Sequence, residues 1–295
     1  MVGHVTRFAP SPTGFLHLGH AYAAIYAAEV AQSSGGTFLV RIEDTDRIRS
    51  KAEFEVAIDE DLGWLGLNWQ RPVRRQSEHL DAYASALQKL KDLECIYPCF
   101  CTRKAIEAEF RASVGAPQGP DGPIYPGTCK ALTINAQKTR VEQGEQHAWR
   151  MDVAKAVKIL GRSLTFHEFG SGPDGECGQV VVQADVYGDF VLARKDAPAS
   201  YHLTVVVDDA IQGVTMVTRG NDLFLSSHLH RLLQDLLGLP QPLYNHHRLI
   251  CDERGQRLAK RDQATSLREI RAKGTTANQV YAMLGFTSRS DQQTI

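Results

Sequence analysis

The residues best suited to chemistry lie near the start of the chain, between Arg7 and His20, in the run RFAPSPTGFLHLGH. His17 and His20 flank Gly19, where a proline-rich turn ends and a helix is expected to begin. A helix N-terminus attracts anions through its free N–H groups and its dipole. Histidines there can donate hydrogen bonds to phosphate oxygens, and a glycine lets a nucleotide approach the backbone. An isolated His-x-Gly-His would indicate only a turn with two surface histidines, but the complete run favours a nucleotide site.

A second group of reactive side chains is a cluster of cysteines. Four of the six cysteines lie between positions 95 and 129, namely Cys95, Cys99, Cys101 and Cys129. Thiolates are preferred ligands of structural zinc, and clustered cysteines in a chain without a secretory signal bind metal more often than they form disulfides. Cys99, Cys101 and Cys129 therefore predict a structural zinc site that lacks one ligand. Cys95 is one candidate for that ligand.

The elements that must position these residues follow an α/β pattern. Short runs rich in β-branched and aromatic residues predict strands at Val5–Phe8 and Thr37–Ile42. Between them, an alanine-rich helix is predicted from about Gly19 to Ala31, because alanine has the best helix propensity and packs closely on a sheet. A strand, a helix and a second strand in this order begin a parallel sheet.

Beyond this unit, the composition changes along the chain. Amphipathic helices are predicted around Ile58, Leu87 and Leu229, whereas Val205 to Val207 fit either a strand or a buried helix. The middle of the chain is rich in Gly, Pro and Cys. We therefore predict a catalytic domain in two halves, residues 1–95 and 179–245. An inserted subdomain, residues 96–178, separates the halves, and a C-terminal segment, residues 246–295, follows them.

The overall composition is that of a globular protein. The chain has 295 residues, of which 43% are hydrophobic and 23% charged, and no stretch approaches the roughly 18 apolar residues that a membrane span needs. Its net charge of −1 argues against nonspecific coating of nucleic acid. The segment from His246 onward nevertheless carries nine Lys and Arg against five Asp and Glu, so a local phosphate-binding surface is compatible with the composition.

The run from Arg7 to His20 resembles the signature of class I aminoacyl-tRNA synthetases, and its first half is similar to that of the glutamyl subgroup. Further similar blocks follow in order, up to about Arg268: RIEDTD from Arg41, YHLTVVVDD from Tyr201, TRGNDL from Thr218, and RLAKR in place of the KMSKS loop, of which only the second lysine, Lys260, is kept. The resemblance implies a Rossmann-type parallel sheet with an inserted zinc-containing α+β subdomain and a short helical C-terminal region.

The resemblance also implies residue roles for the ATP-dependent activation of an amino acid, with Mg²⁺ accompanying ATP. His17, His20 and Lys260 would be catalytic and, with Gly19, would bind ATP. The glutamate pocket would comprise Arg7, Phe8, Ala9, Pro10, Ser11, Glu43, Tyr201 and Arg219. Arginines can fork onto a carboxylate, and Glu43 can hold the α-ammonium group. Similar short enzymes complete the zinc site with a tyrosine four residues before the last cysteine, a position matched by Tyr125.

The acceptor is suggested by length. Only 35 residues follow Lys260, too few for an anticodon-binding domain. The chain thus resembles short glutamyl-type enzymes that activate L-glutamate without tRNA and transfer it to the queuosine at the wobble position of tRNA(Asp). The implied partners are glutamate, ATP and the anticodon stem-loop of that tRNA, and we expect a cytoplasmic monomer. The basic tail could contact RNA phosphates through Arg254, Arg257, Arg268, Arg271 and Lys273.

Two other interpretations remain open at this level. The chain could be a truncated or divergent glutamyl-tRNA synthetase, in which case tRNA(Glu) would be the acceptor. It could also be a non-catalytic RNA-binding paralogue. The altered loop around Lys260 favours this interpretation, and the intact run from Arg7 to His20 opposes it. Glutamate-dependent exchange of pyrophosphate into ATP separates an enzyme from a binding protein.

Overall fold

The computed structural model describes residues 3–102, 104–106, 108, 118–119, 122–194, 197–251 and 265–287. Lys260, Arg254 and Arg257 lie outside the described residues, so the predicted roles of the loop that contains them stay predictions. No helix within the described ranges is both long and apolar enough to cross a lipid bilayer.

The first sheet confirms the predicted α/β pattern. Three parallel strands lie in the order β1 (Val5–Phe8), β2 (Thr37–Ile42) and β3 (Gln70–Arg75). Helix α1 (Leu18–Ser33) contacts β1 and β2 and buries alanines along its length, as expected for a small-residue helix on a sheet. Helix α2 (Ala52–Trp64) buries Ile58 and Leu62 in the same core.

A second sheet continues beside the first. Its order is β11 (Met216–Gly220), β12 (Leu243–His247), β8 (Thr165–Glu168) and β9 (Gly178–Val181), and all neighbours are parallel except β8 with β9. Strand β11 adjoins β1, where the Thr215 N–H donates to the Val5 carbonyl at 3.0 Å. The carboxyl ends of β1, β2, β11 and β12 therefore point into a common region.

Helices from different parts of the chain pack together in one large hydrophobic core. This core joins α3 (Leu80–Asp92), α7 (Tyr201–Ile211) and α8 (Ser226–Leu237), with α6 (Val153–Leu160) beside them. Val205, Val206 and Val207 belong to α7, which resolves the ambiguity between strand and helix in favour of a buried helix. Short 3-10 turns occur at Gln76–Glu78, Ala184–Tyr187 and Asn221–Leu223.

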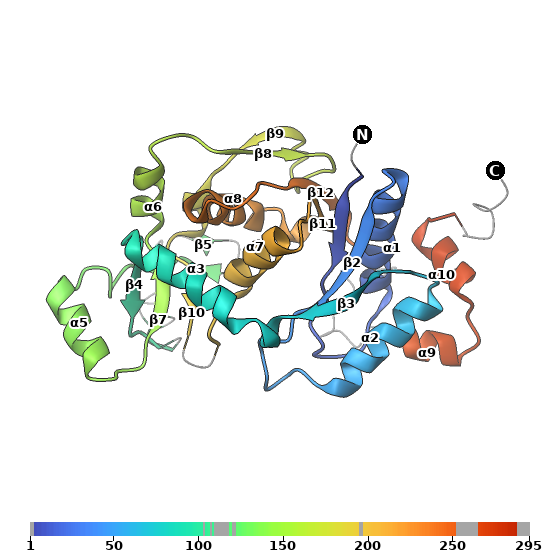
Figure 1. Ribbon diagram of the computed structural model, residues 1–295, viewed down its shortest axis with the longest axis horizontal. Coiled ribbons are helices and arrows are strands. Elements are labelled where there is room, and N and C mark those ends of the chain that lie inside the picture. The colour runs from blue at the N-terminus through green and yellow to red at the C-terminus, as the bar shows by residue number, and fades with distance from the viewer. Residues whose placement is uncertain are drawn as a thin grey trace.

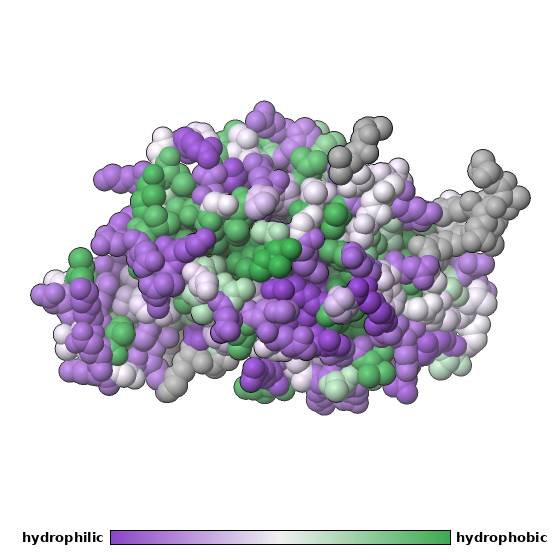
Figure 2. All heavy atoms as spheres, in the orientation of Figure 1, coloured by the Kyte–Doolittle hydropathy of each residue, from purple (hydrophilic) through white to green (hydrophobic). Residues whose placement is uncertain are grey.

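A small antiparallel sheet lies near one end of the molecule. It has the order β10 (Val191–Ala193), β7 (Ala148–Met151) and β4 (Ile96–Cys99), with α5 (Ile134–Glu142) beyond it and a two-residue ribbon of β5 (Gln118–Gly119) and β6 (Gly122–Pro123). Figure 1 shows α5 at the opposite end from α9 (Leu267–Ala272) and α10 (Ala277–Leu284). The face shown in Figure 2 is mainly hydrophilic.

The C-terminal helices are attached directly to the start of α1. The Leu267 N–H donates to the Leu16 carbonyl at 2.7 Å, and an isolated antiparallel bridge joins Ser266 to His17. Leu267, at the start of α9, is fully buried in the core of the first sheet. The segment that follows the Lys260 loop is thus anchored beside one of the two signature histidines.

Buried charges join the first sheet to α7. Asp208 is fully buried and accepts hydrogen bonds from Arg74 Nε at 2.7 Å, Gln76 Nε2 at 3.0 Å and Tyr83 Oη at 2.8 Å. Arg41, also fully buried, lies with its Nε 3.7 Å from the same carboxylate. A buried charge that loses its partners is costly, so this cluster orients α7 relative to β2 and β3.

We expect Asp208→Ala to lower the free energy of unfolding by about 3–5 kcal/mol, because the buried Arg41 and the half-buried Arg74 would lose an anionic partner. Asp59→Ala is the matched control, since Asp59 is 53% exposed in its ion pair with Arg71 and its loss should change stability by no more than about 0.5 kcal/mol. Urea denaturation measures both. Equal effects of the two substitutions would contradict a stabilising role for the buried cluster.

Candidate active site

One cavity gathers all the described residues that the sequence assigned to the amino-acid and ATP sites. It has a volume of about 560 Å³ and lies at the carboxyl ends of β1, β2, β11 and β12, where open α/β sheets commonly bind ligands. Its lining includes Arg7, Phe8, Ala9, Pro10, Ser11, His17, Gly19, His20, Glu43, Tyr201 and Arg219. Segments more than 200 residues apart in the sequence thus form a single candidate site.

The two signature histidines form the N-terminal cap of α1. His17 Nδ1 accepts a hydrogen bond from the Gly19 N–H at 3.1 Å, and His20 Nδ1 accepts from the His17 N–H at 3.2 Å. In each neutral ring the proton is therefore on Nε2, the nitrogen that can donate to an anion. The helix dipole and both rings, whose centroids are 3.9 Å apart, suit this end of the cavity to phosphate.

Arg7 lines the cavity, but its guanidinium already holds a protein carboxylate. Its Nε and Nη2 donate to the two oxygens of Asp209 at 3.0 and 3.3 Å, and Nη1 donates to the Thr218 carbonyl at 3.1 Å. Burial would raise the pKa of Asp209, but the guanidiniums of Arg7 and Arg41 outweigh it and lower that pKa. A substrate carboxylate would therefore have to compete with Asp209 for the guanidinium of Arg7, contrary to the expectation that Arg7 binds the substrate directly.

Glu43 lies beyond the end of β2 and lines the same cavity. Its Oε1 accepts a hydrogen bond from Arg41 Nη2 at 3.1 Å. Burial raises the pKa of Glu43 in spite of the attraction exerted by Arg41 and Arg7. An ammonium group bound next to this carboxylate would favour its ionised form, because an opposite charge lowers the pKa of a carboxyl group.

Arg219, at the end of β11, is buried, and neutral groups surround its guanidinium. Within the described ranges, no carboxylate lies at ion-pair distance from its guanidinium. Its N–H groups donate to neutral acceptors on three elements, namely His246 Nε2 at 3.0 Å, His230 Nδ1 at 3.1 Å, Tyr201 Oη at 3.3 Å and Ser227 Oγ at 2.6 Å. A buried positive charge that remains uncompensated beside a cavity is suited to binding a carboxylate.

Histidines around Arg219 remain neutral because they are buried next to a cation. Burial lowers the pKa of His246 to about 4, although the Glu168 carboxylate 2.6 Å from its Nδ1 acts in the opposite direction. Burial, and then the Arg219 charge, lowers the pKa of His202 to about 4 and that of His230 well below its usual value. Neutral rings can accept hydrogen bonds from Arg219, as the geometry requires.

A second cavity adjoins the first. It has a volume of about 710 Å³ and shares four wall residues with the first cavity, namely Ser11, Thr13, Glu43 and Tyr201. Its other walls come partly from the segment around the small antiparallel sheet, including Tyr125 and Arg150. The two cavities therefore meet where these four residues lie.

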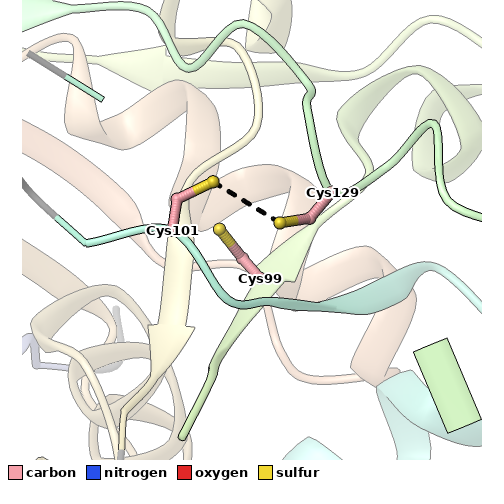
Figure 3. Close-up of side chains that lie close together, drawn as sticks. All are labelled: Cys99, Cys101 and Cys129. Carbon is pink, nitrogen blue, oxygen red and sulfur yellow. Dashed lines mark hydrogen bonds between the residues drawn. The ribbon is translucent and has the colours of Figure 1, made fainter. Parts of the chain in front are cut away.

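The cysteine cluster is brought together by the fold. The sulfur atoms of Cys99, Cys101 and Cys129 all lie within 4.8 Å of one another, with Cys101 and Cys129 at 3.5 Å, and Figure 3 shows the three thiols turned toward a common point. Tetrahedral zinc–thiolate bonds place sulfurs about 3.8 Å apart, so this arrangement fits a zinc ion. Tyr125 Oη lies 3.5 Å from the Cys101 sulfur.

Cys95 does not belong to this cluster. It is fully buried in the large core of α3, α7 and α8, and its thiol donates to the Leu90 carbonyl at 3.3 Å. Among the candidates for the fourth ligand, the geometry favours Tyr125 and opposes Cys95.

Several residues that shape the site were not predicted as site residues from the sequence. Ser227, His230, His246 and Glu168 hold Arg219 directly or through one ring. For Ser227 and His230 the only signal was proximity to the TRGNDL block, because helix α8 begins a few residues after it, whereas His246 and Glu168 had no such signal. Their hydrogen bonds join separate elements, so spacing along the chain carries no information about them.

The comparisons with known proteins agree with this geometry. Residues 4–294 match the family described as tRNA synthetases class I (E and Q), catalytic domain. A glutamyl-Q tRNA(Asp) synthetase from Rhodobacter capsulatus is 46% identical over 288 residues, which cover 95% of this chain and 99% of that protein. A glutamate–tRNA ligase from Aquifex aeolicus is 38% identical over 271 residues, covering 91% of this chain and 54% of that protein.

Solved structures place the fold in the same group. A glutamate-tRNA synthetase from Elizabethkingia anophelis matches with a TM-score of 0.72 at 29% identity, covering 88% of this chain and 53% of that one. The chain therefore belongs to the class I glutamyl- and glutaminyl-tRNA synthetase family. Within it, the chain groups with the glutamyl-Q tRNA(Asp) synthetases, several of which match over 84% to 99% of their own length, whereas it spans about half of the glutamate–tRNA ligase from Aquifex.

We expect the free energy of unfolding to fall by on the order of 2–4 kcal/mol between pH 7.5 and pH 5. In the unfolded chain, histidines gain protons below about pH 6.5. In the native chain, His202 and His246 stay neutral down to about pH 4, and the pKa of His230 lies well below its usual value. The native chain thus binds fewer protons, and acid favours unfolding. Asp61, whose pKa burial raises to about 6, acts in the opposite direction. Urea denaturation at the two pH values provides the measurement, and undiminished stability at pH 5 would contradict the neutral assignment.

Cys101→Ser should lower the zinc content of the purified protein well below about one equivalent, because a hydroxyl is a far weaker zinc ligand than a thiolate. Cys95→Ala should leave the zinc content unchanged, since this thiol lies in a different core. Metal analysis by mass spectrometry measures both. Full occupancy in the Cys101→Ser variant would remove this residue from the site.

Proposed function

We propose that the protein activates L-glutamate with ATP in the absence of tRNA and transfers the glutamyl group to the queuosine at the wobble position of tRNA(Asp). The observation that carries this proposal is the cavity of about 560 Å³, in which the capped N-terminus of α1 and the uncompensated charge of Arg219 share one space. One end suits a triphosphate and the other suits a dicarboxylate amino acid.

The first step joins an oxygen of the glutamate α-carboxylate to the α-phosphorus of ATP, and pyrophosphate leaves. Such a reaction asks the protein mainly for positioning and for stabilisation of phosphate charge. His17 and His20 would donate from Nε2 to phosphate oxygens, and Gly19 lets the nucleotide lie close to the helix. Lys260 would add a positive charge, and Mg²⁺ would accompany ATP as part of the substrate.

Glutamate would lie between two charges of opposite sign. Arg219 would bind a carboxylate of glutamate, with Tyr201 at its side, and Glu43 would hold the α-ammonium. Arg7 would form part of the pocket wall, where its ion pair with Asp209 holds it in place. The segment of Phe8, Ala9, Pro10 and Ser11 would complete the pocket. An uncharged side chain on the amino acid would leave the buried guanidinium unpaired, which provides the selectivity.

The second cavity is the proposed place of the acceptor nucleoside. It meets the glutamate pocket at Glu43 and Tyr201, so a nucleophilic group of the queuosine could attack the carbonyl carbon of the glutamyl-adenylate, with AMP as the leaving group. Helix α9 carries Arg268 and Arg271, which would contact phosphates of the anticodon stem-loop with the rest of the basic tail. The full-length match to proteins named glutamyl-Q tRNA(Asp) synthetase supports this acceptor.

One structural zinc ion is proposed for the cysteine cluster, with Cys99, Cys101, Cys129 and Tyr125 as ligands. The guanidinium of Arg150 lies 4.1 Å from the centre of the Tyr125 ring, a cation–π contact that helps to hold the ring beside the thiols. Because Tyr125 and Arg150 line the second cavity, zinc binding would also shape the place of the acceptor nucleoside.

We expect glutamate-dependent exchange of pyrophosphate into ATP without tRNA, followed by transfer of labelled glutamate to tRNA(Asp) that carries queuosine. Lys260→Ala should reduce exchange by about 10²–10³-fold, because it removes a positive charge that would stabilise the phosphates of ATP during the reaction. Lys89→Ala, at an exposed position of α3, should be fully active.

The acceptor is tested by three tRNA preparations. Labelling of tRNA(Asp) with queuosine, and of neither tRNA(Asp) without queuosine nor tRNA(Glu), supports the proposal. Labelling of tRNA(Glu) would instead indicate a truncated glutamyl-tRNA synthetase, and a wild-type protein without any exchange activity would indicate a non-catalytic paralogue.

A further inference from the structure

The guanidinium of Arg219 is held in place by side chains that do not neutralise it. Four acceptors without charge receive its N–H groups, and the carboxylate of Glu168 reaches it only through the imidazole of His246. Arg7, in the same cavity, instead has Asp209 as a direct anionic partner. Two arginines in one site are thus supported in opposite ways.

Hydrogen-bond donors determine the tautomers of the two rings beside Arg219. An arginine can only donate, so His230 Nδ1 and His246 Nε2 must both be acceptors. The remaining proton of His230 is then on Nε2, which donates to His202 Nδ1 at 3.1 Å. His246 correspondingly donates from Nδ1 to Glu168. His230 is 2% exposed and lies on α8, and, unlike Arg219, it does not line the cavity.

A neutral acceptor has a specific advantage at this position. A carboxylate in place of the ring would form an internal ion pair and compete with an incoming carboxylate, as Asp209 does at Arg7. An apolar side chain would leave an N–H of a buried cation without a partner, and the guanidinium would turn toward other acceptors. A neutral imidazole fixes the direction of the N–H and leaves the charge available.

We propose that His230, backed by His202, is a positioning residue that orients the Arg219 guanidinium for the carboxylate of glutamate while preserving its charge. This inference rests on the proposed function, since it assigns to Arg219 the binding of glutamate. It concerns substrate affinity, because His230 contacts neither the phosphates nor the reacting carboxylate.

The first test is the kinetics of glutamate-dependent pyrophosphate exchange by the full chain. His230→Leu should raise the KM for glutamate on the order of tenfold, as expected for the loss of one hydrogen bond to a charged group, and leave the KM for ATP unchanged. His230→Gln should restore the KM for glutamate, because an amide can accept from Arg219 and donate to His202.

His228→Leu is the matched control on the same helix. His228 is also buried, but its Nδ1 accepts from the Gln183 N–H at 3.0 Å, and its ring packs against Phe166 and Phe224. We expect this variant to be less stable and to keep the wild-type KM for glutamate. An unchanged KM in His230→Leu, or a KM in His230→Gln as high as in His230→Leu, overturns the proposal.

A second measurement is independent of activity. Nitrogen NMR shifts of the wild-type imidazoles at pH 7.5 should show His230 protonated on Nε2 and His246 protonated on Nδ1. Protonation of His230 on Nδ1 overturns the proposal even if no exchange is detected. A wild-type protein that has the expected tautomers but no exchange activity would instead contradict the proposed function, so the two failures are distinguishable.

Discussion

Two adjacent carboxylates at the end of α7 connect the two halves of the catalytic core. Asp209 accepts from Arg7 of β1 and Arg41 of β2, and Asp208 accepts from Arg74 of β3. Because separating any of these buried charges from its partners costs several kcal/mol, the helix can take one position relative to the first sheet. The cavity walls follow from this position: α7 presents Tyr201 at its first turn, and β2 leads into Glu43.

Charge in the cavity is distributed by the same logic. Arg7 and Arg41 are compensated internally and serve the architecture, whereas Arg219 is surrounded by neutral acceptors and keeps a net charge. At the end of the signature run from Arg7 to His20, the capped start of α1 offers a helix dipole to phosphate. This arrangement would let two anionic substrates bind side by side without placing both on the same cation, as proposed for glutamate and ATP.

Much of the local structure was predictable, since it depends on neighbouring residues. The bounds of β1 and β2 follow from β-branched runs between turn residues, and α1 follows from its alanines. Periodicity could not decide between strand and helix at Val205 to Val207, because a helix buried on all sides has no polar face. Equally, the spacing of the cysteines could not separate Cys95 from Tyr125, which differ in the core that surrounds them.

By itself, the sequence predicted the class of fold and the three clustered thiols, because short motifs encode turns, caps and reactive groups locally. Its resemblance to a known family supplied the proposed glutamate and ATP residues, and those that the structure describes line one cavity. The tertiary structure alone decided which charges are compensated. The partner of Arg7 is 202 positions away in the chain, and those of Arg219 come from α7, α8 and β12. Whether a buried cation is a structural anchor or a ligand site depends on the acceptors that the fold places beside it, and no residue spacing contains that information.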